Sequence, residues 1–370
     1  MLKAFKYRIY PTKEQEKKIV QHIGGCRFVY NWALENKIRY YETSKEKLSA
    51  YDLNYMLKGL KAENHWLKEV NSQSLQQTNK NMESAFTRFF REKKGFPKFK
   101  SKKNPVQSFQ IPQHYTIDFE KQLIKLPKIG NVKIVISRTF EGTPKTATVS
   151  RTPTGKYFIS ILVDDGKEIP EKQPFDENST VGVDLGIKDS AILSNGEKFE
   201  NPKYLKNSLQ KLKVLSKKLS KKVKGSNNWK KAKLKLSRLH EKISNQRNDF
   251  QHKLSSRLIS ENQAIALETL NVKGMIKNHC LAQSISDAGW SSFVTKLEYK
   301  AEWAGKTILR IGTFEPSSKI CNVCGYYKSD LTLKTREWIC PDCKTKHDRD
   351  INAAINIKKF ALQSQNLISP

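Results

Sequence analysis

The stretch CNVCGYYKSDLTLKTREWICPDCKTKHDRDINAAINI, from Cys321 to Ile357, joins two pairs of cysteines directly to a cluster of acidic residues and asparagines. The cysteines follow the pattern C-x2-C-x15-C-x2-C and are Cys321, Cys324, Cys340 and Cys343. Each pair presents two thiolates from a tight turn, and four thiolates complete a tetrahedral zinc site. Because no histidine or carboxylate obviously replaces a cysteine, we expect one closed, structural zinc site. A chance grouping of reduced cysteines is the alternative.

The remaining cysteines and the apolar segments indicate the compartment. The chain has six cysteines, and Cys26 and Cys280 are isolated from the two pairs. This arrangement suits a metal site in a reducing cytoplasm better than a disulfide framework. No signal peptide opens the chain, and no apolar run approaches the roughly 18 residues of a membrane-spanning helix. We therefore expect a cytoplasmic protein.

The charge of the chain points to a polyanionic partner. Among 370 residues, 68 are lysine or arginine and 36 are acidic, which gives a formal net charge of +32. Nucleic acid is the favoured partner, because neutralising phosphates releases counterions and gives affinity that does not depend on sequence. A lysine-rich solvated surface and an anionic membrane are the alternatives, and we expect no membrane partner.

The first half of the chain predicts a β domain that contains a helical insertion. The segment KAFKYRIYP, from Lys3 to Pro11, reads as a strand that proline stops. Helical periodicity follows to about Lys94 and begins with a capping box at Thr12 to Gln15. Short alternating segments separated by turn residues recur between 107 and 164, which is typical of a small, barrel-like β domain. Since the first strand precedes the helices, we interpret the helical block as an insertion.

The second half alternates strands with helices. A linker rich in proline and charge, 165–179, precedes it. Strands are expected in VGVDLGI, in AIALETL (264–270) and in KTILRIG (306–312). Residues 203–257 predict a lysine-rich helical hairpin that is broken at 224–228. This alternation indicates a mixed α/β domain.

Three acidic residues stand out in this second half. Asp184 lies in an apolar strand between Gly182 and Gly186, which allow another backbone or a ligand to come close. Glu268 is the lone acid of a second apolar strand, and Asp350 begins a segment that suits a helix packed on a sheet. Each could be a capped or salt-bridged residue. Together they have the layout of a ribonuclease-H-like nuclease, in which carboxylates hold two divalent ions, Mg²⁺ or Mn²⁺.

Other polar residues lie near this cluster in the sequence. Arg336, between the cysteine pairs, could contact a phosphate or could be a solvated arginine. His279 and His347 are expected to be polar surface residues, although His347 lies close to Asp350 in the sequence.

The motifs of the chain resemble those of a known family. In order, the chain contains YRIYPTKEQ, CRFVYNWAL, GFPKFK, GVDLGIKD, LETLNV, SISDAGWSSFVTKLEYKAEWAG, FEPSSKICNVCG, CPDC and HDRDINAAINI. These segments resemble the TnpB family, which consists of RNA-guided DNA nucleases that are encoded by insertion sequences and related to type V CRISPR effectors. The resemblance runs nearly from end to end.

The resemblance implies an α+β multidomain fold. A β-barrel wedge domain would carry a helical recognition insert, and a RuvC-type, ribonuclease-H-like α/β nuclease domain would follow with the zinc module inserted in it. The implied ranges are 1–10 and 95–175 for the wedge, 11–94 for the insert, 178–315 and 347–360 for the nuclease domain, 316–346 for the zinc-binding target-nucleic-acid module and 361–370 for a tail.

The resemblance also implies roles for individual residues. The catalytic, metal-holding acids map to Asp184, Glu268 and Asp350. In DRDINAA the second aspartate matches the family's catalytic residue, which leaves Asp348 as the weaker candidate. Arg336 matches an arginine that approaches the scissile strand in relatives.

Recognition of duplex DNA beside the target would fall to the helical insert and the barrel. By resemblance, Ser72 and Gln76 occupy the reading positions of a helix, Gln110 is the barrel counterpart, and Tyr51 is a further candidate. Amide side chains can bond the edge of adenine in a groove, so this chemistry is reasonable. Solvation of a helix surface is the alternative.

The expected function is that of an RNA-guided, metal-dependent DNA endonuclease. Its partners would be a guide RNA from the transposon end and double-stranded target DNA, with one protein monomer per RNA, at the nucleoid of a bacterial or archaeal cell. The protein would read a short target-adjacent motif, base pairing would read the rest, and one RuvC site would cut both strands. The alternatives are an RNA-guided repressor that binds without cutting and a transposase-like recombinase.

Overall fold

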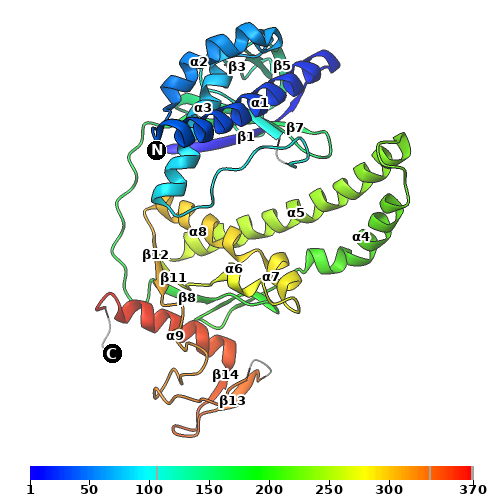
Figure 1. The fold of residues 1–370 in the computed structure, drawn as a ribbon. Helices are drawn as coiled ribbons and strands as arrows, with labels where there is room; N and C mark the ends of the chain where they lie inside the picture. Colours follow the sequence, from blue (N-terminus) through cyan, green and yellow to red (C-terminus); the bar gives the residue numbers. More distant parts are fainter. Residues whose placement is uncertain (106, 333–334, 368–370) are drawn as a thin grey trace. The chain divides into compact units, whose positions relative to one another are not determined.

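The structure is a computed structural model that describes residues 1–105, 107–332 and 335–367. It has the expected α+β composition and divides into two compact units, Met1–Lys167 and Glu168–Pro370 (Figure 1). The division falls inside the predicted linker. Within the described residues, no helix is both long enough and apolar enough to cross a membrane.

The first unit is built on a seven-stranded antiparallel sheet with the order β2-β6-β7-β1-β5-β4-β3. The first strand in the sequence, β1, lies between β7 and β5, so strands that follow the helical block pair on both of its sides. Among the described residues, β2 and β3 are the two edge strands of this sheet, and they do not pair with each other. The strands are β1 (Leu2–Tyr10), β2 (Gln107–Ile111), β3 (Thr116–Asp118), β4 (Leu123–Leu126), β5 (Gly130–Val135), β6 (Thr143–Arg151) and β7 (Tyr157–Asp164).

Between β1 and β2 the chain is helical. The predicted capping box is confirmed, because the Thr12 side chain accepts a hydrogen bond from the backbone of Gln15, whose own side chain accepts one from the backbone of Thr12. Ile19 and Leu75 from the helices share one buried cluster with Ile9 and Ile159 of the sheet. The elements are α1 (Lys13–Ser44), α2 (Ala50–Glu63), the 3-10 helix η1 (His65–Glu69) and α3 (Ser72–Arg91).

The second unit contains a five-stranded mixed sheet with the order β10-β9-β8-β11-β12. Strands β8, β11 and β12 are parallel, and β9 and β10 continue the sheet antiparallel. The strands are β8 (Thr180–Asp184), β9 (Asp189–Leu193), β10 (Lys198–Glu200), β11 (Ala264–Glu268) and β12 (Thr307–Ile311), and a separate hairpin consists of β13 (Glu337–Ile339) and β14 (Lys346–Asp348).

Helices cover both faces of this sheet (Figure 1). The predicted lysine-rich hairpin is confirmed as α4 (Tyr204–Ser220) and α5 (Asn227–Glu261). On one face, Ile265 and Leu267 of β11 pack in a cluster with α5 and α8. On the other face, Ala264 and Ala266 pack with Ile357 of α9. The remaining helices are α6 (Val272–Met275), α7 (Ala282–Ala288), α8 (Trp290–Ala304) and α9 (Arg349–Gln363).

The end of α9 differs from the expected start of a tail at residue 361. The helix continues to Gln363, and Ala361 and Leu362 are fully buried. The buried apolar positions of this helix therefore extend to Leu362, more than one turn beyond Ile357. Residues 368–370 of the expected tail lie outside the described residues.

Candidate functional site

The four predicted cysteines come together in the structure. Their sulfur atoms all lie within 4.8 Å of one another, with Sγ–Sγ distances of 3.6 Å for Cys321–Cys343 and 3.5 Å for Cys324–Cys340. A tetrahedral ion with Zn–S bonds of about 2.3 Å requires sulfurs about 3.8 Å apart. The donor set and its spacing therefore fit one zinc ion.

The two halves of this cluster are built alike. The carbonyl of Cys321 accepts from the amide of Gly325, and the carbonyl of Cys340 accepts from the amide of Lys344. Gly325 has a φ of +80° and Lys344 a φ of +61°, so both turns end in the left-handed region. Equivalent turns present each pair of thiols from one side, which is the arrangement that a zinc knuckle needs.

His347 is not the surface residue that the sequence suggested. It is 5% exposed, its Nε2 lies 3.1 Å from Sγ of Cys321, and its ring packs 4.6 Å from that of Trp338. The surface expectation is wrong because Trp338 and His347 are opposite each other in the β13–β14 hairpin, facing the cysteines. This pairing across a short hairpin gave no periodic signal in the sequence. His279 is exposed as expected.

Asp184 and Glu268 are the last residues of two neighbouring parallel strands. Side chains alternate between the faces of a strand. Because Val183 and Leu267 pack on the α5 and α8 side, Asp184 and Glu268 belong to the opposite face, which α9 covers. The strand register thus brings the two carboxylates to the C-terminal ends of adjacent parallel strands and to the same face of the sheet.

Asp350 enters this region because α9 packs directly on β8. A Cβ atom on Gly182 would lie 2.0 Å from the carbonyl oxygen of Ala354, so only glycine permits this approach. The prediction that Gly182 admits another backbone is confirmed. Asp350 is the second residue of α9 and is therefore held near the end of β8.

The electrostatics of Asp184 reflect this arrangement. The pKa of Asp184 is raised to about 8, mainly by burial and also by the carboxylates of Glu268 and Asp350, while Arg349 opposes the shift. Three acids that share one space repel one another when ionised. A cation among them would relieve that repulsion.

Asp350 is neutralised by two arginines. Its Oδ1 accepts from Nη2 of Arg349 at 2.6 Å, and its Oδ2 accepts from Nη1 of Arg336 at 3.2 Å. Within the described part of the chain, only the four cysteines form a set of ligand atoms close enough for one ion. The three carboxylates therefore lie in one region without forming a closed ligand set.

Asp348 has a different role from Asp350. Its Oδ1 accepts from the amides of Asp350 and Ile351, each at 3.0 Å, which makes it the N-cap of α9. Its Oδ2 accepts from Nζ of Lys198 at 2.6 Å. Both oxygens of Asp348 are thus used in positioning the helix.

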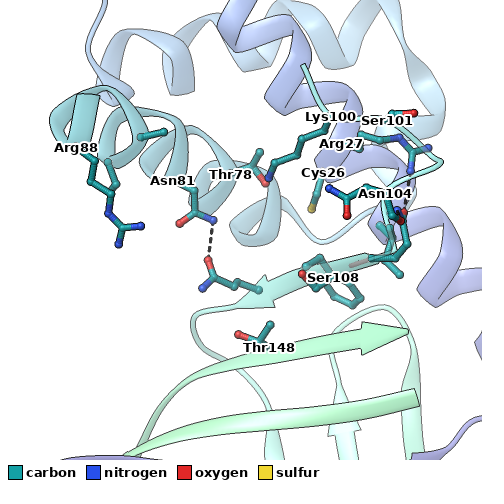
Figure 2. A pocket seen from close by; sticks show the side chains of 16 residues that line it. Cys26, Arg27, Thr78, Asn81, Arg88, Lys100, Ser101, Asn104, Ser108 and Thr148 are labelled. Atoms are coloured by element: carbon teal, nitrogen blue, oxygen red, sulfur yellow. Dashed lines mark hydrogen bonds between the residues drawn. The ribbon is translucent and has the colours of Figure 1, made fainter. Parts of the chain in front are cut away.

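A polar cavity of about 470 Å³ lies in the first unit, between α1, α3, β2 and the loop before β2. Figure 2 shows that the side chains of Asn81, Arg88 and Lys100 border it. Gln110 reaches this cavity, where its Oε1 accepts from Nδ2 of Asn81 at 2.7 Å. Arg27 also lines the cavity, and none of the described residues that line it is acidic. Arg27, Asn81, Arg88 and Lys100 were not predicted from the sequence, because only their charge and amide groups distinguish them there from other surface residues.

The other predicted readers of DNA do not line this cavity. Ser72, at the start of α3, is exposed and accepts a hydrogen bond from Nζ of Lys61 at 2.7 Å. Gln76, one turn later, is exposed, and Tyr51 in α2 is 81% exposed. All three are exposed on helices, whereas Gln110 is held by Asn81.

Three family models match the chain. One described as "Probable transposase" (OrfB_IS605) matches residues 160–279, a "Cas12f1-like, TNB domain" matches 290–357, and a "Helix-turn-helix domain" matches 1–46. In this structure the segment 1–46 contains strand β1 and one long helix, α1.

Curated relatives extend over almost the whole chain. A Streptomyces pristinaespiralis protein named "Putative RNA-guided DNA endonuclease" is 39% identical, covering 96% of this chain and 88% of its own length. The chain belongs to the TnpB family. The Escherichia coli K12 relative "Putative RNA-guided DNA endonuclease InsQ" is 34% identical over 96% of this chain and 91% of its own length. A "TnpB-like protein" of Acanthamoeba polyphaga mimivirus is 22% identical over 97% of this chain and 73% of its own.

Solved structures share the fold of this TnpB-family chain. The protein of a Cas12f1-sgRNA-target DNA complex superposes with a TM-score of 0.56 at 14% identity, covering 97% of this chain and 98% of that one. A mini-RNA-guided endonuclease, CRISPR-Cas_phi3, gives a TM-score of 0.51 at 9% identity, covering 100% and 94%. At these identities the likeness concerns the fold alone.

Proposed function

We propose that this chain is an RNA-guided, metal-dependent DNA endonuclease with a RuvC-type active site. The observation that carries the proposal is the convergence of Asp184, Glu268 and Asp350 at one edge of the mixed sheet. Apolar strands and a close helix contact at Gly182 bring them there, and a lone carboxylate such as Asp184 or Glu268 is costly in an apolar strand unless it has a partner. The names of the curated relatives support the same activity.

The three carboxylates would hold two Mg²⁺ or Mn²⁺ ions, since oxygen ligands suit these hard cations. Such ions activate a water nucleophile and stabilise the leaving oxygen in phosphodiester cleavage. Asp184 supplies its charge from a buried position, where the attraction to a cation is strong. Arg336, which is half exposed and already contacts Asp350, is placed to bind a phosphate of the scissile strand.

The partners of the proposed nuclease are a guide RNA from the transposon end and double-stranded target DNA. A net charge of +32 is large for a short DNA footprint, and a structured RNA would neutralise much of it. The Cas12f1 protein that shares the fold was solved in complex with both kinds of partner, an sgRNA and target DNA. One protein monomer per RNA is the simplest stoichiometry, and the nucleoid of a bacterial or archaeal cell is where it would act.

The first unit would act as the wedge domain with its helical recognition insert and would read the target-adjacent motif. Gln110 and Asn81 present amides at a cavity whose other polar groups include Arg27, Arg88 and Lys100. Amides suit base edges, and cations suit backbone phosphates. Ser72, Gln76 and Tyr51 would extend this surface along the exposed face of the helices.

The four cysteines would bind one structural zinc ion in the inserted module. Their closed tetrahedral spacing leaves no position for a substrate, so the ion would stabilise the module instead of taking part in cleavage. A guided repressor without cleavage is disfavoured by the presence of all three acids. A transposase-like recombinase would use the same acids for strand transfer, and an assay of the reaction products distinguishes it.

The test is a cleavage assay on a plasmid library with Mg²⁺, with and without an RNA copied from the DNA next to the gene. We expect double-strand cuts only with the RNA, at sites that follow its 3′-terminal guide segment when that segment is changed. An Asp184→Ala protein loaded with the same RNA is the control, and it should bind the target without cutting. Equal site-specific cutting by RNA-free protein, or joining of DNA ends, would contradict the proposal.

A further inference from the structure

Three buried polar side chains connect the four-cysteine cluster to the acidic cluster, which consists of Asp184, Glu268 and Asp350. They act on the segment 315–322 that leads into the first cysteine pair, which we call the knuckle approach. Asn352 and Asn356 of α9 and Ser317 of the knuckle approach are each 5% exposed or less. An amide or hydroxyl buried to this extent is retained only where its hydrogen bonds are satisfied.

The two asparagines fasten the knuckle approach to α9. Nδ2 of Asn352 and Nδ2 of Asn356 both donate to the carbonyl of Ile320, at 2.7 and 2.6 Å. Oδ1 of Asn352 also accepts from the amide of Asn322 at 3.0 Å. Cys321, a zinc ligand candidate, lies between the two residues that are held. The position of this cysteine is therefore fixed relative to the helix that carries Asp350.

Ser317 extends the connection to the sheet. Its carbonyl accepts from Nδ2 of Asn356 at 2.7 Å, and its hydroxyl donates to Oε1 of Glu268 at 2.5 Å. One residue thus touches both α9 and the last residue of β11. A hydroxyl that donates to one carboxylate oxygen fixes the orientation of the group and leaves the other oxygen available to a cation.

We propose that Ser317 is a positioning residue for Glu268, and that Asn352 and Asn356 couple its position to the first zinc knuckle. Zinc bound by the cysteines then holds the knuckle approach in place, and the knuckle approach orients the Glu268 carboxylate toward Asp184 and Asp350. This inference rests on the proposed function and adds a route by which the structural metal controls affinity for the catalytic metal. Loss of an outer-shell partner of a metal ligand typically lowers metal affinity by about 10- to 100-fold.

Ser317→Ala, Ser317→Thr and Ser318→Ala form a matched set of variants. Threonine keeps the hydroxyl. Ser318 is the neighbouring residue, and its hydroxyl bonds to none of the described residues. The direct measurement is Mn²⁺ binding to the full-length protein, followed by electron paramagnetic resonance, with binding to Asp184→Ala protein subtracted as background. Zinc content and affinity for RNA and target DNA are measured alongside.

We expect Ser317→Ala to bind Mn²⁺ about 10- to 100-fold more weakly while keeping its zinc and its nucleic-acid affinity. Ser317→Thr should restore most of the affinity, and Ser318→Ala should match the wild type. Chelating zinc should weaken Mn²⁺ binding in the wild type but add little in Ser317→Ala, because both changes act through one contact.

Unchanged Mn²⁺ affinity in Ser317→Ala, or an equal loss in Ser318→Ala, would overturn the inference. A further effect of zinc removal in Ser317→Ala as large as in the wild type would overturn the coupling. If instead Asp184→Ala binds Mn²⁺ and cuts like the wild type, the proposed nuclease site itself is wrong, so the two failures are distinguishable.

Discussion

Replacing Gly182 by alanine should move Asp350 away from Asp184 and Glu268 without changing any of the three acids. The added Cβ would lie 2.0 Å from the carbonyl oxygen of Ala354 and 2.8 Å from the amide nitrogen of Lys358. Both neighbours are backbone atoms of α9, so no side-chain rotation can relieve the clash. The contact must lengthen to at least the 3.4 Å of an ordinary contact, so α9 has to move away from β8 by about 1.4 Å.

A displacement of this size should be decisive for cleavage. Asp350 lies at the start of α9 and would move with the helix, while Asp184 and Glu268 would remain on the sheet. A misplacement of about 1 Å in a reacting constellation can lower a rate by about 100-fold. Overpacking of this kind also destabilises a fold by about 1–3 kcal/mol. We therefore expect at least about 100-fold slower cutting and a modest fall in the unfolding temperature.

The assay is single-turnover cleavage of a target plasmid by the preloaded RNA complex, with target binding measured separately by gel shift. Gly59→Ala is the matched control, because Gly59 is exposed in α2 and an added Cβ there meets no atom within 4 Å. It should cut like the wild type. If Gly182→Ala cuts within threefold of the wild-type rate, the acids do not depend on the α9–β8 contact, and the reasoning fails.

Other expected outcomes concern the acids, the zinc cluster and the motif readers. Alanine at Asp184, Glu268 or Asp350 should each slow cleavage by more than about 10³-fold while leaving target binding intact, because residues that act as a unit lose activity together. Asp348→Ala should be milder and should lower stability by about 1 kcal/mol through loss of the helix cap; normal cutting by Asp350→Ala would overturn the assignment of the third acid. Cys340→Ser should release zinc and unfold the small module, as followed by elemental analysis and proteolysis, and freshly purified wild-type protein without zinc would contradict the cluster's role. Gln110→Ala, in a library assay, should relax the target-adjacent motif at one position with little change in cutting rate at permitted sites, and an unchanged motif would remove Gln110 from the readers.

Local sequence patterns predicted those parts of the fold that depend on neighbours in the chain. The capping box at Thr12, the apolar strands that end at Asp184 and Glu268, and the break in the helical hairpin each arise from residues within a few positions of one another. The cysteine spacing predicted the four-cysteine cluster for the same reason, since each cysteine pair lies in a local turn. Gly182 was informative because an apolar strand rarely contains glycine unless a backbone approaches it.

Contacts between segments that are distant in the sequence could not be predicted from local patterns. His347 reads as a polar surface residue, and its burial follows from the register that sets it opposite Trp338. Ser317 meets Glu268 across 49 positions of sequence, and Asn81 meets Gln110 across 29. A serine or an amide gives no periodic signal, so its partner becomes known only when the tertiary fold is known.

The four-cysteine cluster adjoins the acid at the start of α9 because the β13–β14 hairpin contributes to both. Strand β14 supplies His347 to the cysteine cluster and ends at Asp348, which caps the helix. Opposite it, β13 pairs Glu337 with Asp348, and Arg336, immediately before β13, contacts the Asp350 carboxylate. The backbone carbonyl of Arg336 also accepts from the amide of Arg349, the first residue of α9. Loss of zinc should therefore disturb the helix cap and an arginine at the acidic cluster together, and we expect it to impair cleavage more than RNA binding.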